Sequence, residues 1–169
     1  MGLPAKLKYF DVFADGTSWL GKVDEVSLPE MKIKTESFRG GGMVGEVDIN
    51  MGLEKLEMEI KLGGATIEAM RQFGRVGVAG VMLRFVGGYQ DDSTGGILPG
   101  ELVVRGMHTS LNPGSAKTGA NTEWTVKSTL SYLKWTLNSR VECEIDMLNL
   151  VWFSDGVDHL AAMRAALQQ

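Results

Sequence analysis

The chain has 169 residues, enough to bury a core of its own, and this length predicts a single domain over residues 1–169. Its formal net charge of −4 argues against a surface that grips nucleic acid, and no stretch reaches the roughly 20 apolar residues that a membrane anchor needs. Its single cysteine, Cys143, excludes an intrachain disulfide framework and a cysteine-rich metal site.

The first half of the chain alternates apolar and polar side chains with a period of two, which predicts β-strands. The clearest strand is 56–62, where the apolar side chains share one face and Glu57, Glu59 and Lys61 take the other. Further strands are predicted at 18–28, 31–38 and 44–51. A glycine cluster at 40–45 separates the last two strands and predicts a pliable connection.

One short helix is predicted inside the domain, at 65–73. It follows a double glycine and ends before Gly74, a residue that commonly stops helices. Within it, Ile67, Met70 and Phe73 recur at helical spacing. This apolar stripe predicts a face that packs on the core.

The second half of the chain continues the strand pattern. Strands are predicted at 81–87, 101–110, 122–127, 129–137 and 141–147, with loops at 90–100 and 112–121. The pair Asn138-Ser139 predicts a two-residue hairpin turn. The tail, 156–168, predicts a C-terminal helix that Asp155 caps, and Leu160, Met163 and Leu167 form its apolar packing stripe.

These elements predict a mainly β (α+β) fold: an antiparallel β-sandwich or barrel with one short internal helix and one C-terminal helix. Several strands are amphipathic, and a sheet of this kind has free edges that seek partners unless they are paired or blocked. A chain with pairing potential of this kind is a candidate for ring or barrel assembly.

Several motifs match cofactor-binding or catalytic patterns, but the sequence around each of them does not fit the function. Gly40, Gly42 and Gly45 match a dinucleotide-binding spacing, but an alternating strand pattern follows where a helix is required. A phosphate-loop-like run at 16–22 has Val23 where the metal-binding hydroxyl belongs. The two histidines, His108 and His159, lack metal-site spacing and a nucleophile elbow. We therefore expect no catalytic site, no cofactor and no bound metal, and we interpret the chain as a structural subunit rather than an enzyme.

Acidic side chains gather on two predicted strand faces. Glu57 and Glu59 share one face, and Glu142, Glu144 and Asp146 share another at about 7 Å spacing. A paired-carboxylate sugar site would want aromatic platforms, which the second face does not supply. A wet strand face or a functional acidic surface remains.

Short motifs spread over nearly the whole chain resemble one protein family. In the first half they are Leu3-Pro4-Ala5-Lys6-Leu7-Lys8-Tyr9, Phe13-Ala14-Asp15-Gly16, Ser27-Leu28-Pro29, Lys34-Thr35-Glu36-Ser37-Phe38-Arg39-Gly40-Gly41-Gly42-Met43 and Met51-Gly52-Leu53-Glu54. In the second half they are Val103-Val104-Arg105-Gly106, Ser131-Tyr132-Leu133-Lys134, Glu144-Ile145-Asp146-Met147-Leu148-Asn149 and Asp155-Gly156-Val157-Asp158. Together they resemble the major tail tube protein of contractile-tailed temperate phages, and the tube protein of R-type pyocins is similar. The resemblance is weakest from 72 to 99.

The resemblance implies hexameric rings that stack into a hollow tube inside a contractile sheath. It implies further partners: the tape-measure protein in the lumen, the baseplate and the tail terminator. DNA would pass through the tube without specific binding. The protein would be a virion component that is assembled in the cytoplasm of the bacterial host.

On this basis we expect residues 38–50 to form an extended hairpin that reaches an adjacent ring. The residues of its candidate inter-ring loop are Arg39, Gly40, Gly41, Gly42 and Met43. The candidate lumen-facing acids are Glu57, Glu59, Glu142, Glu144 and Asp146. Two alternatives stay open: the tube of a tailocin or secretion-type machine that carries no DNA, and a small monomeric β-barrel that binds a ligand.

Overall fold

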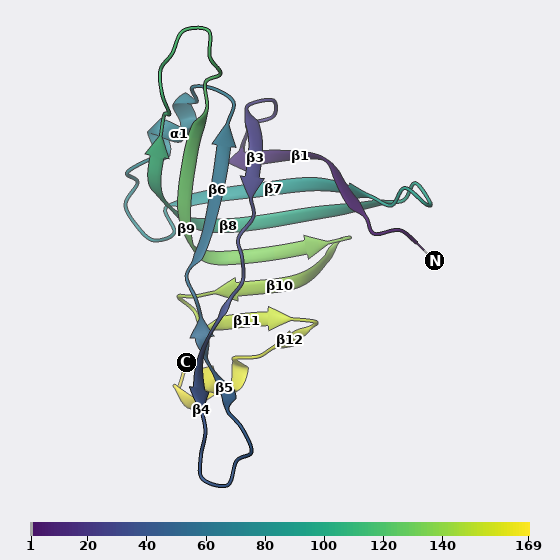
Figure 1. The fold of residues 1–169 in the computed structure, drawn as a ribbon, viewed down its shortest axis with the longest axis vertical. Coiled ribbons are helices and arrows are strands. Elements are labelled where there is room, and N and C mark those ends of the chain that lie inside the picture. The colour runs from purple at the N-terminus through teal and green to yellow at the C-terminus, as the bar shows by residue number, and fades with distance from the viewer. Residues whose placement is uncertain (1) are drawn as a thin grey trace.

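A computed structural model describes residues 2–169 as a β-rich fold with two short helices (Figure 1). The elements are β1 (Lys6–Ala14), β2 (Thr17–Ser18), β3 (Val23–Ser27), β4 (Ile33–Phe38), β5 (Val47–Leu53), β6 (Leu56–Leu62), α1 (Ile67–Gln72), β7 (Val81–Gln90), β8 (Ile97–Asn112), β9 (Trp124–Leu137), β10 (Arg140–Asp146), β11 (Val151–Ser154), β12 (Val157–Asp158) and α2 (Ala161–Ala166). The predicted mainly β fold is confirmed.

Within the described residues, ten strands form one antiparallel sheet in which neighbours follow the order β12-β11-β10-β9-β8-β7-β1-β2. Strand β6 leaves this path, because it pairs with β9 on one side and with β3 on the other. The sheet therefore folds over into two layers. Figure 1 shows β3, β6 and the first half of β9 crossing in front of the strands of the larger layer. We call this larger layer the main sheet: β1, β2, β7, the first half of β8, the second half of β9, and β10 to β12.

The corner between the layers lies in the two longest strands, β8 and β9. Their pairing shifts register between Arg105 and Gly106, and again between His108 and Ser110. At the first shift the two backbones approach so closely that a Cβ on Gly106 would lie 1.9 Å from the carbonyl oxygen of Thr129. A strand glycine that permits close backbone approach is thus what lets the sheet bend here.

The core fills the space between the two layers. Strand β6 confirms its predicted alternation: Leu56, Met58, Ile60 and Leu62 are at most 2% exposed. Across the core, Phe85 stacks on Phe10 at 5.6 Å between ring centroids and meets the edge of Trp135 at 6.4 Å. Each fully buried apolar side chain of this size contributes about 1.5–3 kcal/mol.

The structure differs from the predicted strands in three places. The predicted strands 122–127 and 129–137 are one continuous strand, β9, which bends rather than breaks. Strands β7 and β8 run into the predicted loop 90–100 and leave a turn of only 91–96 between them. Strands β1, β11 and β12 were not predicted. The Asn138-Ser139 turn is confirmed, with φ of 49° and 65°.

Helix α1 confirms the predicted inner helix, but its predicted packing face was wrong. Ile67, Met70 and Phe73 are about half exposed or more, while Ala69 and Gln72 face the sheet and are buried. Helical spacing marks the stripe correctly, yet it cannot tell which face of a six-residue helix meets its own sheet.

The C-terminal helix is shorter than the predicted 156–168, since α2 begins at Ala161. Asp155 does not cap it: with φ of 50° for Asp155 and 74° for Gly156, these two residues form the turn between β11 and β12. Met163 and Leu167 are exposed, so this predicted packing stripe was also wrong. Of the helices that the structure describes, neither has the length and apolar character to cross a bilayer.

Candidate assembly surfaces

The hairpin β4–β5 stands off the body of the molecule, and its loop forms the lower end of the view in Figure 1. Directly paired residues lie on the same side of a hairpin. Phe38 pairs with Val47, and Ile49 lies two residues further along the same side. The opposite side is polar: the Ser37 hydroxyl donates a 2.8 Å hydrogen bond to the Asp48 carboxylate. The hairpin is thus amphipathic.

Near its base, the hairpin turns its polar side toward the body. Asn50 lines a cleft together with Trp152 and Met163 of the C-terminal segment. Gly52, with φ of 100°, adds a residue to β5 opposite a register shift, and Leu53 beyond it packs against the core. The apolar side, formed by Phe38, Val47, Ile49 and Met51, is left about half exposed. This orientation is the reverse of what a free monomer would favour.

The predicted inter-ring loop residues, Arg39 to Met43, lie at the tip of this hairpin. The Met43 N–H donates a 3.2 Å hydrogen bond to the Gly40 carbonyl, which closes a tight turn. Gly42 takes a φ of 88°, which favours glycine. Val44 is fully exposed next to this turn. The tip is therefore a small structured turn with an apolar side chain in solvent.

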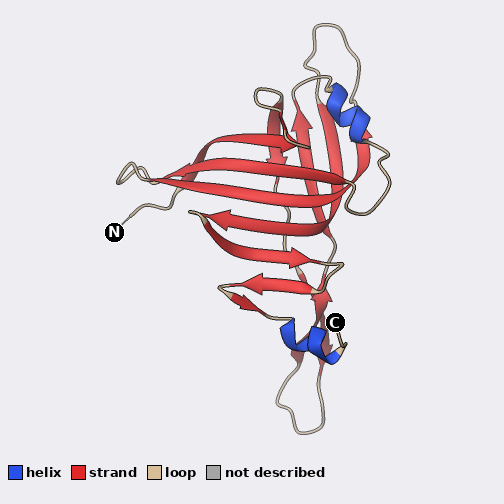
Figure 2. Ribbon diagram, turned by 180° about the vertical axis from the view of Figure 1, so that it is seen from behind, coloured by secondary structure: helices blue, strands red, loops and turns tan. Residues whose placement is uncertain are grey.

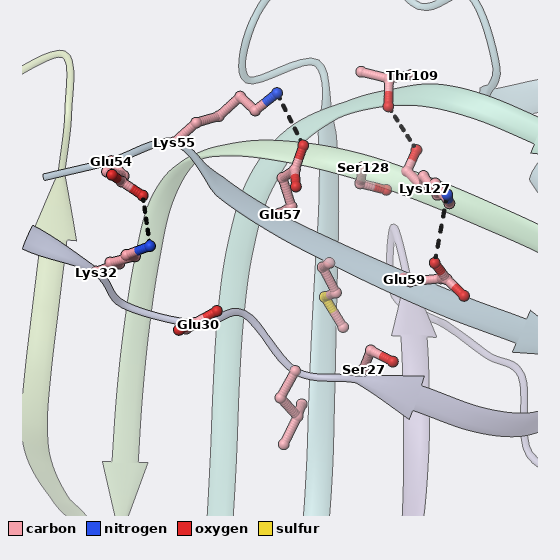
Figure 3. A pocket seen from close by; sticks show the side chains of 12 residues that line it. Ser27, Glu30, Lys32, Glu54, Lys55, Glu57, Glu59, Thr109, Lys127 and Ser128 are labelled. Carbon is pink, nitrogen blue, oxygen red and sulfur yellow. Dashed lines mark hydrogen bonds and ion pairs between the residues drawn. The ribbon is translucent and has the colours of Figure 1, made fainter. Parts of the chain in front are cut away.

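Glu57 and Glu59 line a charged cleft of about 440 Å³ beside β6 (Figure 3). Each has a lysine partner: Lys55 Nζ lies 2.9 Å from Glu57 Oε1, and Lys127 Nζ lies 3.8 Å from Glu59 Oε2. Across the cleft, Lys32 and Glu54 form a further pair at 3.8 Å. The face is charged but largely neutralised, and exposed pairs of this kind contribute about 1 kcal/mol or less each.

The outer face of the main sheet, directed away from the core, holds Glu144 and Asp146. Glu144 lies opposite Lys134 and accepts a 3.0 Å hydrogen bond from the Tyr132 hydroxyl. Burial raises the pKa of Tyr132 to about 12, and the hydrogen bond to Glu144 and its negative charge act in the same direction. Asp146 accepts hydrogen bonds of 3.0 and 3.1 Å from the N–H groups of Leu148 and Asn149, and so holds the turn after β10.

Bases are interleaved with these acids on the same outer face. Arg84 lies over the ring of Phe13, 4.4 Å from its centroid, and Arg105 lies over the ring of Tyr132 at 5.6 Å. Lys134 on β9 lies directly opposite Glu144 on β10, and the two arginines lie on β7 and β8 on the other side of Lys134. The face therefore carries mixed charge rather than a uniform negative field.

The predicted acids do not form one surface. Glu57 and Glu59 lie on the outer side of the small layer, in front in Figure 1, and Glu144 and Asp146 lie on the outer face of the main sheet, which Figure 2 shows from behind. Glu142 is separated from Glu144 by a register shift next to Cys143, and it lines an apolar groove instead. At most one of the two layers can line a common channel.

A buried polar network, missed by sequence reasoning, joins α1 to the sheet. His108 is 7% exposed, and its ring nitrogens lie 2.7 Å from the Ser128 hydroxyl and 3.0 Å from Gln72 Oε1. Gln72 in turn donates a 3.3 Å hydrogen bond to Asp15, which is paired with Arg75. Burial lowers the pKa of His108 to about 4. The sequence could have predicted this burial, because His108 occupies an inward position in the alternation of β8.

The described residues give little support for a metal site or a catalytic site. No three His, Cys, Asp or Glu side chains of residues 2–169 are arranged to hold a metal ion. Ser154 and His159 form an exposed 2.7 Å contact, and the ring of His159 meets the edge of Trp152. A serine–histidine pair needs a third group to orient the base and a site for the oxyanion before it can act as a nucleophile.

Comparison with known proteins identifies the family. A model of a family described as phage tail tube protein FII matches residues 4–167. The chain belongs to this family. The tail tube protein of Escherichia phage P2 is 35% identical over 167 residues, which cover 97% of each chain. The major tail tube protein of Serratia phage KSP20 is 35% identical over 158 residues, 92% of this chain and 91% of that one. The predicted resemblance is confirmed.

Solved structures show the same fold at low sequence identity. A chain from the sheath–tube complex of an extracellular contractile injection system, PVC, in its extended state is 14% identical, with a TM-score of 0.58 over 79% of this chain and 91% of that chain. A chain from the sheath/tube terminator of that system has a TM-score of 0.60 at 13% identity, over 79% of this chain and 97% of that chain. The family fold is therefore shared with contractile injection systems.

Proposed function

We propose that this chain is the structural subunit of the inner tail tube of a contractile phage tail. The observation that carries the proposal is the family match over residues 4–167, together with relatives named as tail tube proteins. The role of such a subunit is mechanical, so it needs no catalytic group. The protein would be a virion component, assembled in the host cytoplasm.

In this proposal six copies form a ring through their main sheets. The main sheet ends at β12 on one side and at β1 and β2 on the other, so its outermost strands leave edges without a partner in one chain. Unpaired edges are an aggregation hazard unless another strand covers them. Pairing edge to edge around six copies removes the free edges of the main sheets by closing them into a barrel.

The outer face of the main sheet would then line the lumen. Its acids Glu101, Glu144 and Asp146 are interleaved with an equal number of bases, Arg84, Arg105 and Lys134. Phosphate binds where Lys and Arg are in excess, because neutralised phosphates release counterions. A lining of mixed sign gives DNA no such binding surface, and the tape-measure protein would occupy the same channel before ejection. Glu57 and Glu59 belong to the opposite side and would face away from the lumen.

The hairpin β4–β5 would reach an adjacent ring. Its apolar side is exposed and points away from its own body, and a two-stranded hairpin is marginally stable by itself in water. Docking on another ring would cover the apolar side. The sheath would surround the stacked rings, and the baseplate and tail terminator would close the two ends.

A second candidate is the tube of an injection machine that carries no DNA. It is favoured by the shared fold with the PVC chains and with a chain from the anti-feeding prophage baseplate, at 12% identity and a TM-score of 0.56 over 80% of this chain and 97% of that one. The 35% identity to phage proteins favours the phage tail. Capsid and terminase genes beside the coding sequence would decide for the phage.

Negative-stain electron microscopy of the purified protein, with size-exclusion chromatography and light scattering, tests the proposal. We expect hollow rings or tubes with six-fold symmetry, either spontaneously or after addition of baseplates as seeds. A protein that stays monomeric with seeds present would overturn the tube assignment and favour a ligand-binding module.

A further inference from the structure

Helix α1 presents a compact apolar surface to solvent. Ile67, Met70 and Phe73 are between 47% and 62% exposed, and Val76 and Val78 continue the surface beyond the helix. A six-residue helix is too short to persist by itself. Here the buried Gln72–His108 contact fixes it to the sheet. The polar contact lies inside and the apolar stripe outside, which is the arrangement of a helix built to meet a second surface.

An apolar groove of about 420 Å³ lies elsewhere on the molecule. Its lining comes from β7 to β10, with one residue before β1 and one before β4. Its lining is Ala5, Met31, Tyr89, Leu98, Trp135, Leu137, Glu142 and Cys143. Almost all of this lining is apolar, with Glu142 as its single acid. Such a concave surface suits an apolar helix face.

The helix and the groove lie at opposite ends of the same strands. Helix α1 precedes the start of β7 at Val81, and Tyr89 of the groove lies near the end of β7. A strand of this length spans roughly 30 Å, so α1 is out of reach of the groove in its own chain. A contact between them must join two copies head to tail, and a repeated contact of this kind builds rings or filaments.

Shape favours α1 over the hairpin as the occupant. The charges at the two surfaces are mixed: α1 carries Glu68 and Arg71, and Glu142 at the groove lies 3.9 Å from Arg140. The stripe is convex and short, with side chains at i, i+3 and i+6. The apolar side of β4–β5 is long and flat. A short concave groove matches the short convex stripe of the helix better than it matches the flat side of the hairpin.

We propose that the exposed face of α1 docks in the apolar groove of a neighbouring copy, as a head-to-tail contact within the assembled tube. The inference rests on the proposed function, since it needs an assembly of many copies. It adds to that function a specific docking surface, the exposed face of α1, and its partner surface, the apolar groove.

Cysteine cross-linking tests the contact with a single substitution. In assembled Met70→Cys protein, a short bis-maleimide should join the introduced thiol of each copy to Cys143 of the next. We expect a ladder of covalent dimers, trimers and higher oligomers in a denaturing gel. The ladder should be absent from the wild type. It should collapse to dimers at most when Cys143→Ser is added. A second pair, Met70→Cys with Leu137→Cys in the Cys143→Ser background, repeats the measurement with a different groove thiol.

Two controls separate the outcomes. Met82→Cys places an equivalent thiol on the outer face of the main sheet and should give no ladder. Phe38→Cys asks whether the hairpin fills the groove. Particles that form normally but give a ladder only with Phe38→Cys, or with neither variant, would overturn the α1 contact and leave the tube assignment intact. A wild type that forms no particles even with baseplates added as seeds would overturn the tube assignment itself.

Discussion

His108 is a histidine in a core position. Its place in the alternation of β8 points it inward with Leu102 and Val104, and the structure satisfies both of its ring nitrogens. If Nε2 donates to Gln72 Oε1, then Nδ1 accepts from the Ser128 hydroxyl, which is the neutral ring. A proton on Nδ1 would break this arrangement and place a charge in the core, which explains why burial lowers the pKa.

This residue predicts a pH dependence of stability. The unfolded chain takes up the proton near pH 6.5 and the folded chain near pH 4, so acid favours unfolding through this window. The stability that depends on His108 is therefore fully present above about pH 6.5 and is lost progressively as the pH decreases toward 4. From pH 7.5 to pH 5 the free energy of unfolding should drop by about 2 kcal/mol through His108.

Urea unfolding of the monomer at several pH values measures this drop. The variant His108→Gln should flatten the dependence, whatever its stability at neutral pH. The control His159→Gln, at the other and exposed histidine, should keep the wild-type slope. Parallel curves for the wild type and His108→Gln would refute the assignment.

At the scale of elements, β4–β5 is the segment whose order depends most on a partner. Every residue of β4 is exposed, and in β5 only Leu53 is half-buried. Its strands form a sheet of their own, paired only with each other. Few buried contacts and an exposed ladder are the features of low local stability.

We expect deletion of residues 40–45 to leave a folded subunit that cannot polymerise. The loop lies outside the core, so circular dichroism and the unfolding midpoint should stay close to wild type. Sedimentation and electron microscopy measure polymerisation. The matched control is Gly41→Ser with Gly45→Ser, which keeps the loop length and adds side chains that meet nothing within 4 Å. Normal tubes from the deletion would rule out the hairpin as an inter-ring element.

At the scale of the whole molecule, two layers that share one core have two outer faces. The main sheet offers the larger face and the free edges, so the lumen assignment follows from topology more than from the positions of acids. In a six-fold ring every charge on that face is repeated six times around the channel. Small changes of charge in one chain therefore act strongly on a passing polyanion.

Charge reversal on the two faces tests this assignment. Glu101→Lys with Glu144→Lys should slow DNA ejection several-fold while tubes still form, because the added lysines bind phosphate. The matched reversal Glu57→Lys with Glu59→Lys, on the opposite layer, should leave the ejection rate unchanged. Time-resolved release of DNA from phage carrying each variant measures both. Equal rates for both pairs, or slowing by the second pair alone, would place the lumen elsewhere.

The sequence by itself determined the local elements and the family. The alternation in 56–62, the Asn138-Ser139 turn and the helix near 67–72 follow from local periodicity and turn chemistry, which act between near neighbours. The motifs gave the family because they are spread over the whole chain. The hairpin around the glycine cluster could also be predicted from neighbouring residues, because strand patterns flank the glycines on both sides.

Only the tertiary structure decided which faces meet. It placed Glu57 and Glu144 on opposite sides, turned the stripes of α1 and α2 outward, and buried His108. Periodicity identifies a face but not its partner, because the partner lies far away in sequence. The bend of β8 and β9 near Gly106 is one physical reason, because it folds the two strands over and brings the inner faces of the two layers together.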